Sequence, residues 1–360
     1  MPSGMRAPLR SRMPSSAGPA ADRPIFAKVG RRPELNENVD LKHGERSVSG
    51  AGCILIRTTV MKLPIHSFLL LLLAAGPVVS SPAKAVGAEL PVRAGLILDL
   101  NADKGVDLED GNRVKAWRNQ VQGNAAGVFV KRDKGRKAPG SGRPTLKKDV
   151  QQIGGHQTLV FKRQELINMD EDVFDHLLTG SGYTWFSVMS IGKQAKGKKD
   201  VNSFFGNLKN SSNYEGIWGC IADDNRPWMG SRGWPRVNPG KQALWNAKNP
   251  KVIAPKPLTL NKYYVVMGRM GSGQGSVDLD LFVNSATAVA SRKVPVNPKA
   301  NSSLMAIGQE RDATNHPGHE SFIGEITRFL IFDRPLSDKE LSDMSLHLMT
   351  RYKIESEPTQ

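Results

Sequence analysis

The chain has 360 residues, of which 39% are hydrophobic, and a formal net charge of +16. This length can bury a sizeable core, and the 35 glycines and 23 prolines favour many short strands joined by turns. The basic residues are scattered and form no dense stripe with interleaved aromatic side chains, so we expect no nucleic-acid partner.

A secretory signal pattern lies at residues 61–85, well inside the chain. Lys62 precedes an apolar run written FLLLLLAA, and the small residues Ala83 and Ala85 supply a cleavage site. The run is well short of the roughly 20 residues that cross a bilayer as a helix. We therefore expect a cleaved signal peptide and no stable membrane span, which predicts a secreted, periplasmic or cell-surface protein.

Residues 1–60 are rich in Arg, Pro, Ser and Gly and show no apolar periodicity. We interpret them as a mis-annotated extension ahead of a true start at Met61; the alternative is a disordered basic tail. Of the two cysteines, Cys53 and Cys220, only Cys220 would follow the signal, so no internal disulfide would support the fold. After position 85 the chain keeps 38 basic and 29 acidic residues, a surplus that suits an acidic glycan partner and solubility equally.

The rest of the chain reads as short runs of β-branched and aromatic residues separated by turn residues. These runs predict strands at 96–100, 157–161, 183–191, 202–206, 216–221, 263–270, 276–283, 303–307 and 322–332. The clearest alternation is in 276–283, where Val277, Leu279, Leu281 and Val283 would face a core. No linker or internal repeat divides residues 90–354, so we expect one domain there.

The C-terminal part predicts a helix over Asp338 to Tyr352. Ser337 is a suitable N-cap, and Glu340, three residues later, completes a capping box. Leu341, Met344, Ser345 and Leu348 follow at helical spacing, which indicates an amphipathic helix.

Three stretches resemble a known family. The first runs from Gly95 to Asp103 (GLILDLNAD) and continues at Gly111 to Gln120 (GNRVKAWRNQ) as a strand, a turn and a V-x-x-W segment. The second, Leu281 to Asn284, is similar to an L-Y-V-N-G strand end, with Ser285 in place of the glycine. The third combines F-x-G-x-I at Phe322 with Phe332-Asp333-Arg334-Pro335-Leu336-Ser337 and a terminal helix ending Arg351-Tyr352-Lys353.

In their order these motifs resemble the bacterial laminin G-like, concanavalin A-like lectin and glucanase domains. The resemblance covers almost the whole chain after the signal. It implies an all-β, antiparallel jelly-roll sandwich with a short C-terminal helix. It says little about activity, because this fold carries lectins, glycosidases, lyases and adhesive modules.

The sequence offers weak candidates for catalysis. The E-x-D-x-x-E pattern of glycosidases on this fold is missing, and so is the lyase Q-x-H motif. Asp278 and Asp280 share a strand face but have no third acidic partner. A glycoside hydrolase or polysaccharide lyase that uses Asp278, Asp280 or Glu325 is therefore the alternative to a noncatalytic module.

Two segments imitate metal sites. A set of acids and an amide after the first strand imitates a calcium loop, but Gly105 falls one place late for its sharp turn. The set consists of Asp99, Asn101, Asp103, Asp107 and Asp110. The two histidines of His316-Pro317-Gly318-His319-Glu320 cannot share a helix face, so we interpret that segment as a loop. We expect no cofactor, with calcium as the alternative.

Most of the tryptophans gather in one part of the chain, with arginines among them and many Pro and Gly residues around them. This cluster contains Trp218, Trp228, Trp234 and Trp245 with Arg226, Arg232 and Arg236. Exposed indoles could stack on sugar rings while guanidinium groups bind carboxylates or sulfates. Alternatively, the indoles cover a satellite core beneath a long loop, as large aromatic residues often do. We expect Trp117 and Trp185, in strand-like contexts, to lie in the main core.

Together these features predict an exported, noncatalytic recognition module. Its predicted partner is a glycan, and an acidic glycan is one of the candidates. It would bind through loops at one rim of the sandwich. The predicted ligand-binding residues are Trp218, Trp228, Trp234, Arg232 and Arg236. A cell-surface module that binds protein instead is the third hypothesis.

Overall fold

The computed structural model describes residues 89–131, 142–195, 201–209, 215–234, 247–310 and 320–356. The chain divides into the units Met1–Gly76 and Pro77–Gln360, and every described residue belongs to the second. The predicted extension (1–60) and signal peptide (61–85) lie outside the described residues. The single domain at 90–354 stays a prediction.

The strands are antiparallel and form two arrays. The first array consists of β1 (Leu96–Asn101), β5 (Thr145–Val150), β6 (His156–Lys162), β8 (Tyr183–Ile191), β13 (Tyr263–Met270), β14 (Ser276–Val283), β15 (Ala290–Pro295) and β17 (Ile323–Phe332). Its order is β15–β14–β13–β8–β17. The far edge of β17 is shared, because its first half pairs with β6 and its second half with β1, while β5 pairs with β6.

The second array consists of β2 (Val106–Glu109), β3 (Arg113–Arg118), β4 (Val128–Val130), β7 (Leu166–Asn168), β9 (Asn202–Gly206), β10 (Gly216–Ile221), β11 (Pro227–Arg232), β12 (Lys251–Ile253) and β16 (Ala306–Ile307). Its order is β12–β11–β10–β9–β16–β7–β4–β3–β2. Short 3-10 helices occupy Asp110–Asn112, Gln151–Ile153 and Asp172–Leu177. Pairings Arg113↔Thr145 and Leu100↔Asn119 link the arrays.

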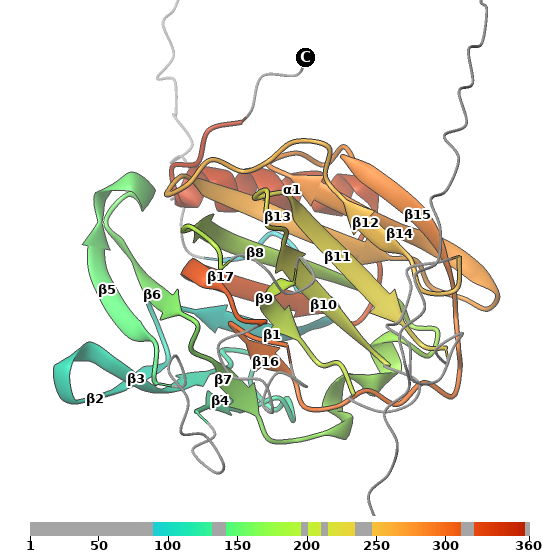
Figure 1. The fold of residues 1–360 in the computed structure, drawn as a ribbon, viewed down its shortest axis with the longest axis horizontal. Coiled ribbons are helices and arrows are strands. Elements are labelled where there is room, and N and C mark those ends of the chain that lie inside the picture. Colours follow the sequence, from blue (N-terminus) through green and yellow to red (C-terminus); the bar gives the residue numbers. More distant parts are fainter. Residues whose placement is uncertain are drawn as a thin grey trace, which may run out of the picture. The chain divides into compact units, whose positions relative to one another are not determined.

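The main core lies between the arrays. In Figure 1, β9, β10 and β11 lie in front of β8 and β17. Alternate residues of both arrays point inward, among them Leu281 from β14 and Ile217 from β10. Trp117 and Trp185 are fully buried in this core, as predicted. The alternation predicted for 276–283 is confirmed, because Val277, Leu279 and Leu281 belong to the core and Val283 packs against it.

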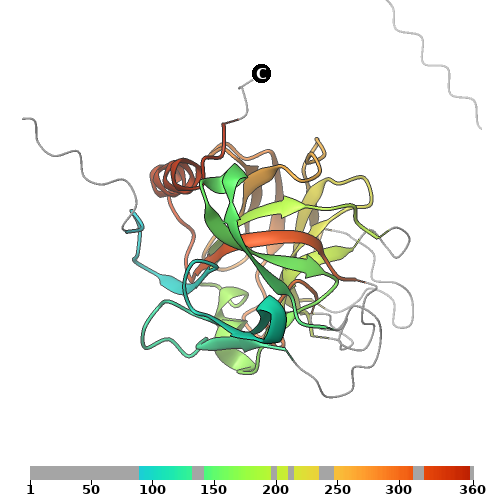
Figure 2. The same cartoon turned by 90° about the vertical axis from the view of Figure 1, so that its left-hand side faces the viewer.

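A helix covers the outer face of the first array. It is α1 (Asp338–Arg351), and its predicted capping box between Ser337 and Glu340 is present. Leu341, Met344, Leu348 and Met349 pack with apolar residues of β8, β13 and β17 in a second cluster. Figure 2 shows α1 at the margin of the described strands. Within the described ranges, the fold is all-β and antiparallel with this one α-helix, and no helix is long and apolar enough to cross a membrane.

A buried ion pair joins the first strand to the last. Arg328 of β17 donates from Nε and Nη2 to the two carboxylate oxygens of Asp99 of β1, at 2.9 and 2.8 Å. The exposed fraction of each residue is 7%. The register of β1 with β17 brings the two together. Asn101 lies opposite Arg328, and Asp99, two residues earlier in β1, lies on the same face as Asn101 and diagonally next to Arg328. This pair therefore fixes the first strand to the centre of the fold.

The predicted calcium candidates do not converge on a common point. Asp99 faces Arg328, Asp103 contacts His156 Nδ1 at 2.6 Å, and Asp107 pairs with Arg118. The side-chain oxygen of Asn101 accepts from the backbone N–H of Asp103. Within the part of the chain that the structure describes, no group of three or more His, Cys, Asp or Glu residues could hold a metal ion.

Replacing Asp99 tests the ion pair. Asp99→Asn would leave the Arg328 guanidinium buried without its carboxylate partner, so we expect the free energy of unfolding to fall by about 3–5 kcal/mol. Asp107→Asn, which breaks the exposed pair with Arg118, should cause no measurable change. Urea denaturation of both variants measures the difference, and equal effects of the two substitutions would contradict the assignment.

Candidate functional site

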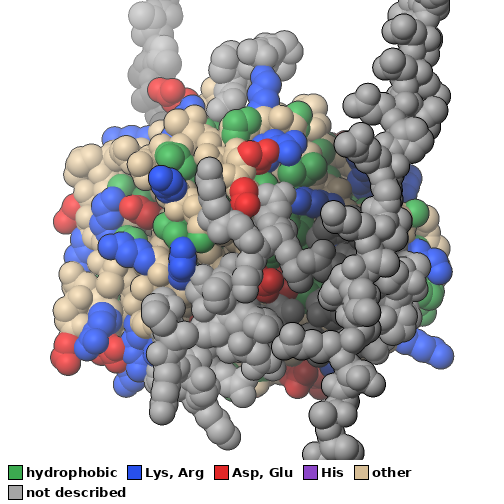
Figure 3. Space-filling view, viewed as in Figure 1, with side chains coloured by type: hydrophobic (Ala, Val, Ile, Leu, Met, Phe, Trp, Pro, Cys, Tyr) green, Lys and Arg blue, Asp and Glu red, His purple; other side chains and the backbone are tan. Residues whose placement is uncertain are grey.

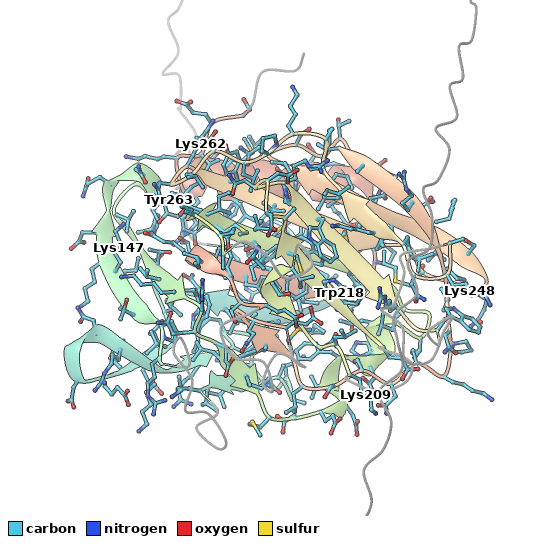
Figure 4. The ribbon with its side chains drawn as sticks, viewed as in Figure 1. Lys147, Lys209, Trp218, Lys248, Lys262 and Tyr263 are labelled. Atoms are coloured by element: carbon cyan, nitrogen blue, oxygen red, sulfur yellow. The ribbon has the colours of Figure 1, made fainter. Side chains whose placement is uncertain are left out.

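The outer face of the second array carries the most unusual set of side chains. Successive residues of β10 and β11 alternate between the two faces, so Ile217 and Met229 enter the main core while Trp218, Cys220 and Trp228 form a separate outer cluster. We call this surface, formed by β9, β10, β11 and β12, the β10–β11 face. Figure 4 labels Trp218 at its centre.

Three basic side chains lie over the tryptophan rings of this region. The guanidinium carbon of Arg232 is 5.5 Å from the ring centroid of Trp218. The ammonium nitrogen of Lys251 is 4.4 Å from the ring of Trp228, and that of Lys248 is 5.6 Å from the ring of Trp234. These distances are those of cation–π interactions, in which the negative face of the ring attracts the cation. The indoles therefore contribute to the positioning of the three cations.

The sheet is built to receive the first indole. Trp218 lies between Gly206 of β9 and Gly230 of β11 in the register. A Cβ atom at Gly230 would lie 2.5 Å from Cζ2 of Trp218, so the ring rests directly on the backbone of β11. Trp228 meets Trp218 edge to face, with ring centroids 6.3 Å apart and an interplanar angle of 90°.

A carboxylate and two small polar groups share this face. Ser203 Oγ donates to Glu310 Oε2 at 3.3 Å and lies 3.1 Å from Cys220 Sγ. Burial raises the pKa of the Cys220 thiol, the Glu310 and Glu320 carboxylates raise it further, and Lys251 lowers it. Both carboxylates and Lys251 therefore lie close enough to Cys220 to act on its charge.

Arg232 is a buried cation. Burial lowers the pKa of its guanidinium to about 10, and the Glu310 carboxylate acts in the opposite direction. Arg232 thus remains charged at neutral pH in surroundings where water screens it weakly. Such a charge interacts more strongly with an anion than a solvated one does.

The predicted ligand-binding residues are partly brought together. Trp218, Trp228 and Arg232 lie side by side, with exposed fractions of 2%, 1% and 5%. Trp234 is half-buried and donates from Nε1 to the carbonyl oxygen of Pro295 at 3.0 Å. Arg236 lies outside the described residues, as do Trp245, His316 and His319.

The position of these residues differs from the loops at a rim that the sequence suggests. They occupy neighbouring strands, because Pro227 stands at the first position of β11, where a missing N–H is tolerated, and Gly230 makes room for Trp218. The satellite-core interpretation describes Trp218 and Trp228 well, since both belong to a small cluster with Leu208.

The residues of the predicted catalytic alternative lie apart, on the first array. Asp280 pairs with Arg269 at 3.1 Å, whereas Glu325 pairs with Lys147 at 3.0 Å and accepts from the Tyr263 hydroxyl. Arg269 and Tyr263 are six residues apart on β13, which at about 3.3 Å per residue places them roughly 20 Å from each other. Asp278 forms an exposed pair with Lys293. These acids do not form one site.

The sequence interpretation missed Ser203, Lys251 and Glu310. Lys251 begins a three-residue strand after Asn249-Pro250, where periodicity is too short to detect. Glu310 follows the two-residue strand β16 and belongs to no acidic motif. These three residues are identified as part of the site only by their closeness to the tryptophans in the folded structure.

Comparison with known proteins gives no family. No family model matches the chain, and neither does any curated protein. Among solved structures, a Trypanosoma rangeli sialidase in complex with 2,3-difluorosialic acid is 14% identical over 73% of this chain, with a TM-score of 0.42. Domain 4 of AbnA, a GH43 extracellular arabinanase from Geobacillus stearothermophilus in complex with arabinotriose, is 14% identical over 71% of this chain and all of that domain, with a TM-score of 0.43.

A third similar structure is the Ruminococcus gnavus IT-sialidase CBM40 bound to α2,3-sialyllactose. It is 14% identical over 45% of this chain and 80% of that one, with a TM-score of 0.33. This chain spans about a third of the length of the T. rangeli sialidase, 34%. All three TM-scores lie below 0.5 and assign neither a family nor a function to this chain.

The close fit between Gly230 and Trp218 is testable. Gly230→Ala would force the indole off the sheet, so we expect a loss of about 1–3 kcal/mol in the free energy of unfolding and a shifted tryptophan emission. Gly142→Ala is the control, because a Cβ there meets nothing within 4 Å. Unchanged emission and stability in Gly230→Ala would show that the ring does not rest on β11.

Proposed function

We propose that the β10–β11 face binds a glycan that carries carboxylate or sulfate groups. The observation that supports this proposal is the pair of basic side chains, Arg232 and Lys251, over the adjacent indole rings of Trp218 and Trp228. The strands belong, in this proposal, to the jelly-roll sandwich that the sequence motifs resemble. The protein is an exported, noncatalytic recognition module that requires no metal.

The indoles have a different role from the one expected of sugar platforms. Trp218 and Trp228 are almost completely buried, so their rings face protein atoms. They orient the half-buried Lys251, which reduces the rotamer entropy that this long side chain loses when it binds, and the buried Arg232 lies beside them as a fixed positive charge. Trp234, half-buried at the end of β11, is the ring best placed to contact a sugar directly.

The chemistry of the face suits an acidic sugar. The ammonium group of the half-buried Lys251 can bind a carboxylate or sulfate as a point charge, and the buried guanidinium of Arg232 adds positive potential beneath it. The carboxylate of Glu310 and the hydroxyl of Ser203 are groups that bind sugar hydroxyls. Around β2, β3, β5 and β6, by contrast, basic and acidic side chains are interspersed on the visible described surface (Figure 3).

A binding screen tests the proposal. The full chain is titrated with polygalacturonate, heparin and neutral dextran, with and without calcium. We expect binding to one or both acidic polymers, independent of calcium, and at least about tenfold weaker in Lys251→Ala, or about 1.4 kcal/mol. Lys262→Ala is the matched control, because Lys262 lies 5.4 Å from the Tyr264 ring but distant from Trp218 in Figure 4.

Two results would overturn this function. One is the absence of binding to any acidic polymer; the other is an equal loss of affinity in Lys251→Ala and Lys262→Ala. The second result would indicate a nonspecific attraction between a basic protein and a polyanion.

A second candidate function is hydrolysis of the bound glycan. It is favoured by Glu310 and Glu320, which both contact Ser203: its hydroxyl donates to the Glu310 carboxylate and its backbone N–H to the carbonyl oxygen of Glu320. In glycosidases one carboxyl group protonates the departing oxygen while the other, ionised, attacks the sugar or activates water. Arg232, beside Glu310, would then bind the substrate's acidic group.

The hydrolysis hypothesis makes its own prediction. Glu310→Gln should reduce the release of reducing ends from the bound polymer by about a hundredfold or more and leave the affinity within a few fold. Ser203→Ala, which removes the hydrogen-bond donor to Glu310 and the contact with Cys220 Sγ but keeps the carboxylate, is the milder comparison. Binding without any release of reducing ends by the unmodified protein would leave the noncatalytic function.

A further inference from the structure

A small polar cavity lies where the end of β1, the middle of β17 and the last turns of α1 meet. Its volume is about 50 Å³. Its lining consists of Glu89, Leu90, Asn101, Lys104, Arg328, His347 and Arg351. We call it the β1–α1 cavity.

The lining carries an excess of positive charge. Lys104, Arg328 and Arg351 contribute three basic side chains, and Glu89 is the one acid among the lining residues. Glu89 is itself paired with Arg93 in an exposed position. Asp99 pairs with the guanidinium of Arg328, and Asp103 pairs with that of Arg351. Neither carboxylate is part of the cavity lining.

The buried guanidinium of Arg328 is rigidly held. Asp99 accepts hydrogen bonds from its Nε and Nη2 and does not engage Nη1. Arg351 approaches from the helix, with its Nη2 3.4 Å from the carboxylate of Asp103. Two planar donors from elements distant in the sequence thus border the same small space, which is the arrangement that binds an oxyanion.

The imidazole of His347 reports the sign of the electrostatic potential there. Burial lowers the pKa of His347, and the nearby charges of Arg328 and Arg351 lower it further. The ring is therefore neutral at pH 7 and offers an N–H donor without adding charge. Its lowered pKa agrees with the positive lining deduced from the geometry.

We propose that the β1–α1 cavity binds one small tetrahedral oxyanion, inorganic phosphate or sulfate. A volume of about 50 Å³ holds roughly three or four water molecules, each of which needs about 10–15 Å³ of such space. That is enough for one oxyanion and too little for a sugar ring. The occupant would join Lys104 after β1, Arg328 of β17 and Arg351 of α1, so its binding stabilises the docked helix.

Titration calorimetry of the full chain with phosphate, and separately with sulfate, tests the site at constant ionic strength. We expect saturable binding to the unmodified protein and roughly tenfold or greater weakening in Lys104→Gln, because a charged donor is lost. Lys115→Gln is the matched control: Lys115 is an exposed lysine of β3 outside the cavity, so the change in net charge is the same.

A local readout separates this site from general salt effects. The ring signals of His347, assigned with His347→Gln, should move as phosphate is added, while those of His176 in the 3-10 helix Asp172–Leu177 should not. Lys251→Ala should bind phosphate as the unmodified protein does, which keeps this test independent of glycan binding. Glycerol 2-phosphate distinguishes the source: equal affinity assigns the site to a phosphoryl group on a larger molecule, and weaker affinity to the free ion.

The absence of saturable binding to both phosphate and sulfate overturns the proposal. So does unchanged affinity in Lys104→Gln, or a His347 signal that does not move while heat is released. A thermal shift with sulfate that is equal in Lys104→Gln and Lys115→Gln would represent only the general stabilisation of folded proteins by that salt.

Discussion

The buried pair of Asp99 and Arg328 lies at the point where β17 changes its neighbour. Before this point β17 is bonded to β6, and after it to β1, and a register irregularity with β8 occurs between Ile326 and Arg328. A strand that changes partners must be fixed in register, because a slip of one residue would exchange its two faces. The paired charges supply this fixed point, since neither can leave the other without a large desolvation penalty.

The outer faces of the two arrays differ in what packs on them. The first is covered by α1, whose apolar side packs against β13 and β17. On the second array a buried guanidinium, two indoles and a carboxylate share the outer surface. Buried charged groups carry a desolvation cost and are common at binding sites, which is why we propose the function on this second face.

The sequence allows the regular part of this structure to be predicted. Period-two alternation in 276–283 and the capping box at Ser337 depend on neighbouring residues, so local patterns are sufficient to identify them. β11 was missed because Pro227 and Gly230 interrupt the pattern, and both are tolerated only because of their neighbours in the sheet. The pairing of Lys251 with Trp228, and the convergence of Asn101, Arg328 and Arg351, depend on register between distant segments. No local signal reports that register.

The thiol of Cys220 gives the β10–β11 face a built-in reporter. It is unpaired by any disulfide, fully buried in β10, and its raised pKa keeps it protonated. Because only the thiolate reacts readily and the sulfur is fully buried, alkylating reagents and oxidants can modify Cys220 only while the structure around it is locally open. The rate of labelling therefore measures how often this region opens, in the manner of amide hydrogen exchange but at a single atom. A molecule that binds the face and holds it shut would slow that chemistry, even where its own contacts are unknown.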